Sequence, residues 1–118
     1  MKKWGWFIIC LAAINSIAQT SPFNDIRIDS VQGRTYSFVV SGHFYGGQSN
    51  ETHLPCNTIL AEIDDLNASE HEMLVCLGDL FKDIQNDIPF YEKALFSKLK
   101  LPLFNSVGNH DLTDEIYQ

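Results

Sequence analysis

The feature that most constrains the fold of this chain is an uninterrupted apolar run, Met73-Leu74-Val75-Cys76-Leu77, which stops at Gly78-Asp79. A short apolar run without polar alternation is typical of a strand that is buried on both faces, as the strands of parallel sheets are. Parallel strands need crossover connections of a dozen or more residues, usually helical. The run therefore predicts an α/β arrangement in which helices link the strands.

Two further segments have the composition of strands. Residues 36–40 are aromatic and β-branched, and they lead into Ser41-Gly42-His43. Residues 103–107 lead into Gly108-Asn109-His110-Asp111. We expect three parallel strands, each followed by a glycine and a polar side chain. The alternating Ile26 and Ile28 upstream of them are compatible with a short edge strand.

Both stretches between the strands have helical spacing. In the first, apolar residues recur every three or four positions, at Ile59, Leu60, Ile63 and Leu66. Asn57 or Thr58 would be its N-cap. The second helix is predicted over residues 87–100, with Asp87 as N-cap and Pro89 in the first turn, where a missing N–H costs nothing. The predicted order is βαβαβ, which is an α/β architecture.

Composition excludes some classes of function. The 118 residues include 15 acidic and 8 basic ones, for a formal net charge of −7. Such a chain is a poor candidate for binding nucleic acid through a basic face. Three cysteines are too few for a disulfide scaffold or a structural zinc site. Cys56 and Cys76 could pair after export, but Cys76 lies in the apolar run, where burial as a small hydrophobic residue is the favoured interpretation.

Residues 1–18 have the pattern of a secretory signal peptide. Two lysines precede an apolar stretch that is shorter than the roughly 20 residues of a transmembrane helix. Ser16-Ile17-Ala18 places small residues where a signal peptidase cleaves. We expect cleavage after Ala18 and export to the periplasm or the extracellular space, without a stable membrane span; an uncleaved anchor is the alternative. A polar segment, 19–35, and one domain, 36–118, would follow.

The predicted strand ends carry side chains with metal-binding chemistry. In open parallel sheets, groups just beyond the carboxyl ends of the strands meet at one edge. This would bring together His43, Asp79 and Asn109-His110-Asp111. Imidazole and carboxylate ligands suit zinc, manganese or iron. Two such ions bridged by a carboxylate can activate water and stabilise displacement at phosphorus.

These residues resemble the calcineurin-like metallophosphoesterase family, whose signature is Asp-x-His, Gly-Asp-x-x-Asp, Gly-Asn-His-Asp/Glu and two later histidine motifs. The resemblance covers residues 36–111; Gly108 to Asp111 match the third motif in full, and Gly78-Asp79 match the start of the second. It implies the leading half of a two-sheet αββα sandwich. The function that it implies is an exported phosphoesterase that uses two divalent ions, of manganese, iron or zinc, to hydrolyse a phosphate ester.

The resemblance also implies a role for individual residues. Asp79 would be the carboxylate that bridges the two metals, and His43 would be the histidine ligand of the first motif. Asn109 would be a ligand of the second metal. His110 would be the catalytic group that assists departure of the leaving alcohol.

The sequence departs from the family pattern in three respects. Ser41 stands where the family has its first aspartate, and a hydroxyl is a poorer ligand for a hard cation than a carboxylate. Lys82 stands where the second motif ends in aspartate, with Asp83 one residue later. The later histidine motifs are absent, and His53 and His71 lie away from the predicted strand ends. We therefore expect the N-terminal portion of a longer enzyme, inactive alone, with an unpaired strand edge and one uncovered sheet face.

Each candidate residue also has a purely structural interpretation. Asp79 could be a turn residue or a helix cap, His43 could be a loop histidine satisfied by the backbone, and residues 109–111 could form a turn. The alternative function is a secreted binding or assembly module that keeps the fold without catalysis. Ser41 is the sequence feature that favours this alternative.

Overall fold

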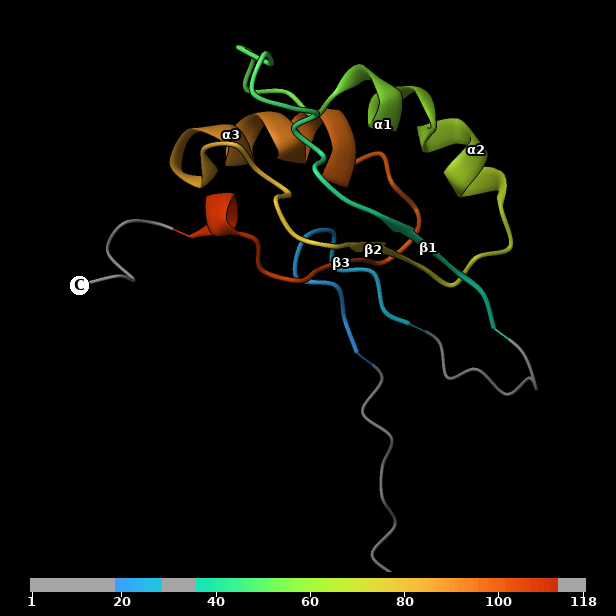
Figure 1. The fold of residues 1–118 in the computed structure, drawn as a ribbon. Coiled ribbons are helices and arrows are strands. Elements are labelled where there is room, and N and C mark those ends of the chain that lie inside the picture. Colours follow the sequence, from blue (N-terminus) through green and yellow to red (C-terminus); the bar gives the residue numbers. More distant parts are fainter. Residues whose placement is uncertain (1–18, 29–35, 113–118) are drawn as a thin grey trace, which may run out of the picture.

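Three strands, β1 (Phe38–Ser41), β2 (Met73–Cys76) and β3 (Leu103–Asn105), form one parallel sheet in the order β1-β2-β3. They belong to a computed structural model that describes residues 19–28 and 36–112 (Figure 1). The predicted signal peptide, residues 1–18, lies outside this part. Within the described ranges, no helix has the length and apolar character needed to cross a membrane.

The apolar run forms the central strand, as predicted. Val75 of β2 pairs with Val40 of β1 on one side and with Phe104 of β3 on the other. Side chains alternate between the two faces of a strand, and Leu74 on the helix side is fully buried. On the opposite face, Met73 and Val75 of β2 are only half-buried, and Phe38 and Val40 of β1 are 47% and 44% exposed. Burial of β2 on both faces was therefore a wrong prediction, because no described element covers the second face fully; the predicted uncovered face is present.

The first crossover contains two short helices, α1 (Asn57–Ala61) and α2 (Ile63–Ala68), instead of one. The break is at Glu62, whose ψ of −4° departs from helical geometry. Ile59 and Ile63 are buried, as the spacing predicted. The N-cap is Cys56, so the prediction of Asn57 or Thr58 was wrong. Because the Cys56 N–H donates to the Phe44 carbonyl at 2.7 Å, a tertiary contact fixes the helix start.

The second crossover contains α3 (Ile84–Tyr91), followed by one π-helical stretch, η1 (Glu92–Phe96). Helix α3 begins at Ile84, which is earlier than predicted, so Asp87 is not its N-cap and Pro89 lies in the second turn. Instead, the buried Asp87 carboxylate reaches back and accepts the N–H groups of Lys82 and Asp83, at 3.0 and 2.8 Å. The carboxylate thus satisfies backbone donors at the helix start from inside the helix.

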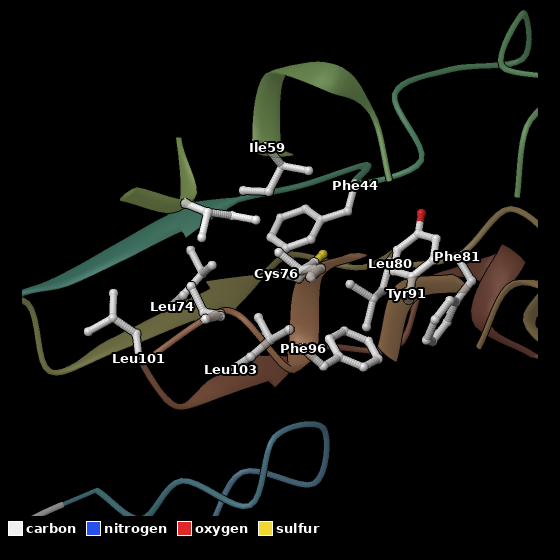
Figure 2. Close-up of a cluster of buried hydrophobic side chains, with 13 residues drawn as sticks. Phe44, Ile59, Leu74, Cys76, Leu80, Phe81, Tyr91, Phe96, Leu101 and Leu103 are labelled. Atoms are coloured by element: carbon white, nitrogen blue, oxygen red, sulfur yellow. The ribbon is translucent and has the colours of Figure 1, made fainter. Parts of the chain in front are cut away.

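The core lies between the sheet and the helices, all of which lie on one side of it (Figure 1). Its fully buried side chains come from every layer, and Figure 2 shows them interdigitating: Phe44, Leu74, Cys76, Leu80, Tyr91 and Leu103. The rings of Phe81 and Tyr91 lie 4.8 Å apart between centroids. The Tyr91 hydroxyl has no partner among the described residues, and its burial, with Asp87 nearby, raises the Tyr91 pKa.

Residues 19–28 form a tight turn beside β3. Ile26 and Ile28 do not form an edge strand; one antiparallel bridge joins Thr20 to Arg27. The Ser21 hydroxyl donates to the Leu103 carbonyl at 2.6 Å and accepts the Leu103 N–H at 3.2 Å. One side chain therefore satisfies backbone groups of β3 that a further strand would otherwise pair.

Candidate functional site

The carboxyl ends of the three strands carry the candidate residues to one end of the sheet. His43 comes shortly after β1, Asp79 shortly after β2, and Asn109 and His110 lie in η2 (Asn109–Asp111), a 3-10 turn after β3. His43 and His110 each contact Asp79. The placement follows from the parallel topology, because all three strands end at the same edge.

Two of these residues have an unusual backbone. His43 has φ 52° and Asp79 has φ 55°, and Gly78 between the strand and Asp79 has φ 93°. A left-handed conformation is uncommon for a residue with a side chain and costs on the order of 1–3 kcal/mol. The His43 N–H donates to the Gly78 carbonyl at 3.3 Å. These sharp turns aim the two side chains at each other.

The Asp79 carboxylate joins all three loops. The residue is 7% exposed. One oxygen, Oδ1, accepts the backbone N–H of His110 at 3.1 Å, and the other, Oδ2, lies 3.3 Å from His43 Nδ1. The N–H contact resembles a helix cap, but it comes from a loop 31 residues away. Asp79 therefore organises the site as well as offering a negative charge to it.

The glycines before Asp79 and Asn109 let two loops touch. A Cβ atom on Gly108 would overlap the Asp79 nitrogen and carboxylate, and one on Gly78 would lie 3.1 Å from Gly108 Cα. Real Cβ atoms essentially never come as close to a backbone nitrogen as the one on Gly108 would, so a side chain at Gly108 would force the loops apart. The glycines thus serve the close approach of the two loops.

Asp111 holds the third loop in shape, a role that the sequence reasoning did not assign. Its Oδ1 accepts the Phe81 N–H at 3.0 Å. Its Oδ2 accepts the Gly108 N–H at 2.9 Å and the Asn105 side-chain amide at 3.0 Å. Asp111 therefore connects the end of β3 to the loop after Asp79. The sequence signal for this role was that an acidic residue directly follows His110.

The two imidazoles of the site flank one aromatic ring. Tyr45 is 5% exposed, and its ring centroid lies 5.7 Å from that of His43 and 5.3 Å from that of His110. His110 Nδ1 lies 3.2 Å from the Lys82 carbonyl. Since a carbonyl only accepts, Nδ1 carries the proton and Nε2 remains for another partner. Tyr45 therefore packs between the two histidine rings.

Asn109 is not brought into this contact group. Asn109 is exposed, and its side chain makes no hydrogen bond within the described ranges. It lines a separate cleft of about 400 Å³ together with His110. Asn109 therefore follows β3 as predicted, while its side chain stays outside the Asp79 contacts.

Lys82 and Asp87 tie the neighbouring loop to α3. The Lys82 ammonium donates to the carbonyls of Gln48 and Asn50, at 2.9 and 2.6 Å. The Asp87 carboxylate also accepts His53 Nδ1 at 2.8 Å. His53 was not assigned to a site from the sequence, because no local pattern links it to Asp87, which lies 34 positions later. In the fold, His53 lines a cleft with His110.

The metal-ligating atoms of this site fill only part of the coordination sphere of a divalent ion. Imidazole from His43 and carboxylate from Asp79 are adjacent, and an Asn109 amide oxygen is a third candidate. Ions such as zinc take at least four ligands. Among residues 19–28 and 36–112, no group of three histidine, cysteine or acidic side chains is arranged to hold a metal. The described residues thus offer part of a ligand set.

The cysteines add no ligand to this site. Cys56 and Cys76 are free thiols, so the disulfide considered as an alternative does not join them. Burial raises the pKa of Cys76 to about 11. Cys76 therefore stays protonated near neutral pH and packs as a small hydrophobic residue, which is the interpretation favoured by its place in the apolar run.

Comparison with known proteins found no relative: no family model, no curated protein and no solved structure matches the chain.

Proposed function

We propose that this chain contributes the leading part of a metal-dependent phosphoesterase of the calcineurin-like type. The observation that carries the proposal is the contact of three strand-end loops on the Asp79 carboxylate, with His43 at one oxygen and the His110 backbone at the other. Both His43 and Asp79 have left-handed backbone, and backbone strain of this kind clusters at functional sites.

The roles of the residues follow from their donors. His43 and Asp79 would hold a divalent ion, completed by ligands beyond this pair. Asn109, which the resemblance implies as a ligand of the second metal, would have to turn toward them from its separate cleft. When bound, such an ion would activate water and neutralise charge on the phosphoryl group. His110, as the imidazolium, would deliver the proton on Nε2 to the leaving alcohol while its Nδ1–H stays on the Lys82 carbonyl, which leaves the neutral ring. Asp79 positions His110 by binding its backbone N–H.

A second candidate is the non-catalytic binding module. An apolar cavity of about 490 Å³ favours it, because small-molecule sites are concave and mostly apolar. The cavity lies between β1 and the helices α1 and α2, and Ser41 and His43 share its lining with apolar side chains. Ser41 in place of a carboxylate weakens any metal site here.

The two candidates differ in how the chain should bind metal. We would titrate the 118-residue chain with Mn²⁺ by calorimetry and compare four proteins: the wild type, Asp79→Asn, Asp65→Asn and Ser41→Asp. Asp65 is an exposed acidic residue of α2 and serves as the control. We expect Asp79→Asn to weaken binding at least about tenfold, a loss of roughly 1.4 kcal/mol. Asp65→Asn should leave binding unchanged.

Ser41→Asp separates the enzyme from the binding module. In a weakened enzyme, the added carboxylate should strengthen Mn²⁺ binding about tenfold. If Mn²⁺ binding does not change, the binding module is favoured. Mn²⁺ binding that survives Asp79→Asn undiminished would show that Asp79 is not a metal ligand.

A further inference from the structure

A cleft beside His110 is not used by the proposed chemistry. It has a volume of about 290 Å³ and lies between residues 50–53, Lys82, Asp83, Asp87 and His110. His110 belongs both to this cleft and to the Asp79 contacts. A ligand in the cleft would therefore lie next to the residue proposed to protonate the leaving alcohol.

His53 is held in one orientation in this cleft. Its Nδ1 lies 2.8 Å from Asp87 Oδ1, and its ring stacks on Phe90 with 5.2 Å between centroids. The Asp87 side chain is only 3% exposed, and its other oxygen is occupied by backbone N–H groups. Because a carboxylate accepts, the His53 proton resides on Nδ1, and in the neutral ring Nε2 is a hydrogen-bond acceptor. A buried aspartate that fixes a histidine tautomer is a common device of functional sites.

The charges of the cleft favour a ligand that donates hydrogen bonds. Glu51, Asp83 and Asp87 bring carboxylates to its lining. Lys82 is the cation there, and its ammonium already binds two backbone carbonyls. A second phosphate would meet the Glu51 and Asp83 carboxylates with little compensation. Hydroxyl groups suit His53 Nε2 and these two carboxylates without that penalty, since both Asp87 oxygens are already occupied.

We propose that this cleft binds the alcohol half of the phosphate ester and recognises its hydroxyl groups through His53 Nε2, with Asp87 as the positioning residue. The inference rests on the proposed function and specifies its substrate class. The leaving group would be a polyhydroxylated alcohol that donates hydrogen bonds, and not a second phosphate.

The test is NMR of histidine ¹⁵N nuclei in the 118-residue chain, with Mg²⁺ present. The probes are glycerol 2-phosphate, phenyl phosphate and diphosphate. Glycerol 2-phosphate should shift the Nε2 signals of His53 and His110 along one saturation curve, and bind about fivefold more tightly than the other two probes. One hydrogen bond of about 1 kcal/mol gives that factor.

The variant His53→Phe keeps the ring that stacks on Phe90 and removes the acceptor. It should lose the fivefold preference for glycerol 2-phosphate. His71→Phe is the matched control, because His71 contacts Ser37 at the opposite end of the sheet, and it should retain the preference. Asp87→Asn should move the His53 proton to Nε2, which the ¹⁵N shift reports without any ligand; an unchanged Nε2 signal would overturn the positioning role of Asp87.

The outcomes separate this inference from the proposed function. If the probes shift His110 but not His53, or if diphosphate binds most tightly, the recognition of hydroxyl groups is overturned while the phosphoesterase proposal stands. If no probe shifts His110, the proposed function fails as well. Equal affinities for all three probes with both histidines shifted would also overturn the stated preference.

Discussion

Left-handed backbone at His43 and Asp79 is the residue-scale feature that distinguishes this site from an ordinary turn. Glycine would adopt the same conformation without strain. Retaining an imidazole and a carboxylate at these positions costs stability that their mutual contact, 3.3 Å between His43 Nδ1 and Asp79 Oδ2, offsets in part. A strained pair of chemically active side chains supports a functional hypothesis better than either residue alone.

The contact between the two glycine loops gives the first stability prediction. Gly108→Ala places a Cβ against the Asp79 nitrogen and carboxylate, where there is no space. We expect this variant to lose about 2–3 kcal/mol of unfolding free energy, measured by urea denaturation. Gly47→Ala is the control, because nothing lies within 4 Å of its Cβ; it should stay within about 0.5 kcal/mol. Similar losses in both variants would contradict the packing argument.

At the scale of elements, β3 depends on a segment that is distant in sequence. Ser21 is 1% exposed, and besides Leu103 its hydroxyl accepts the N–H groups of Phe23 and Asn24, at 3.2 and 3.4 Å. Asn24 donates to the carbonyls of Leu99 and Leu101, at 3.3 and 2.7 Å. Residues 19–28 therefore fasten the chain that enters β3.

Removing the Ser21 hydroxyl tests this connection. Ser21→Ala leaves the buried Leu103 N–H and C=O without their partner, so we expect a loss of about 2 kcal/mol in unfolding free energy. Hydrogen exchange at the Leu103 amide should accelerate. Ser97→Ala is the control, since that exposed hydroxyl donates to the Lys93 carbonyl at 3.2 Å; it should change little. An unaltered Leu103 exchange rate in Ser21→Ala would refute the role of Ser21.

The sequence allowed the elements to be predicted where their signals were local. The apolar run around Val75 predicted the central parallel strand, although not that one of its faces is only half-buried. The spacing of Ile59 and Ile63 predicted the buried face of the first crossover, because helical periodicity reports which side is buried. The start of α3 was misplaced because Asp87 binds backbone N–H groups from inside the helix.

Within the site, His43, Asp79 and His110 were predictable from their positions after the strands. The His53–Asp87 contact was not, since only the tertiary fold brings the loop of His53 onto α3.

At the scale of the whole molecule, the described residues form a sheet with helices on one side only (Figure 1). Tyr36, Phe38 and Val40 leave 57%, 47% and 44% of their surface exposed, and the rings of Tyr36 and Phe38 stack at 6.1 Å. Strand β1 is also the edge of the described sheet. An uncharged edge strand with an apolar face favours self-association, although the net charge of −7 opposes it.

A single lysine on this face should therefore improve solubility. Val40→Lys puts a charge on the edge strand, which disfavours pairing with a second copy. Ile88→Lys makes the same change in net charge at a residue of α3 that is equally exposed, at 44%. We expect Val40→Lys to raise the concentration at which light scattering begins by about twofold or more, and Ile88→Lys to raise it less. Equal gains would contradict the edge-strand argument, because both variants reduce the net negative charge by one and differ only in the surface that carries the lysine.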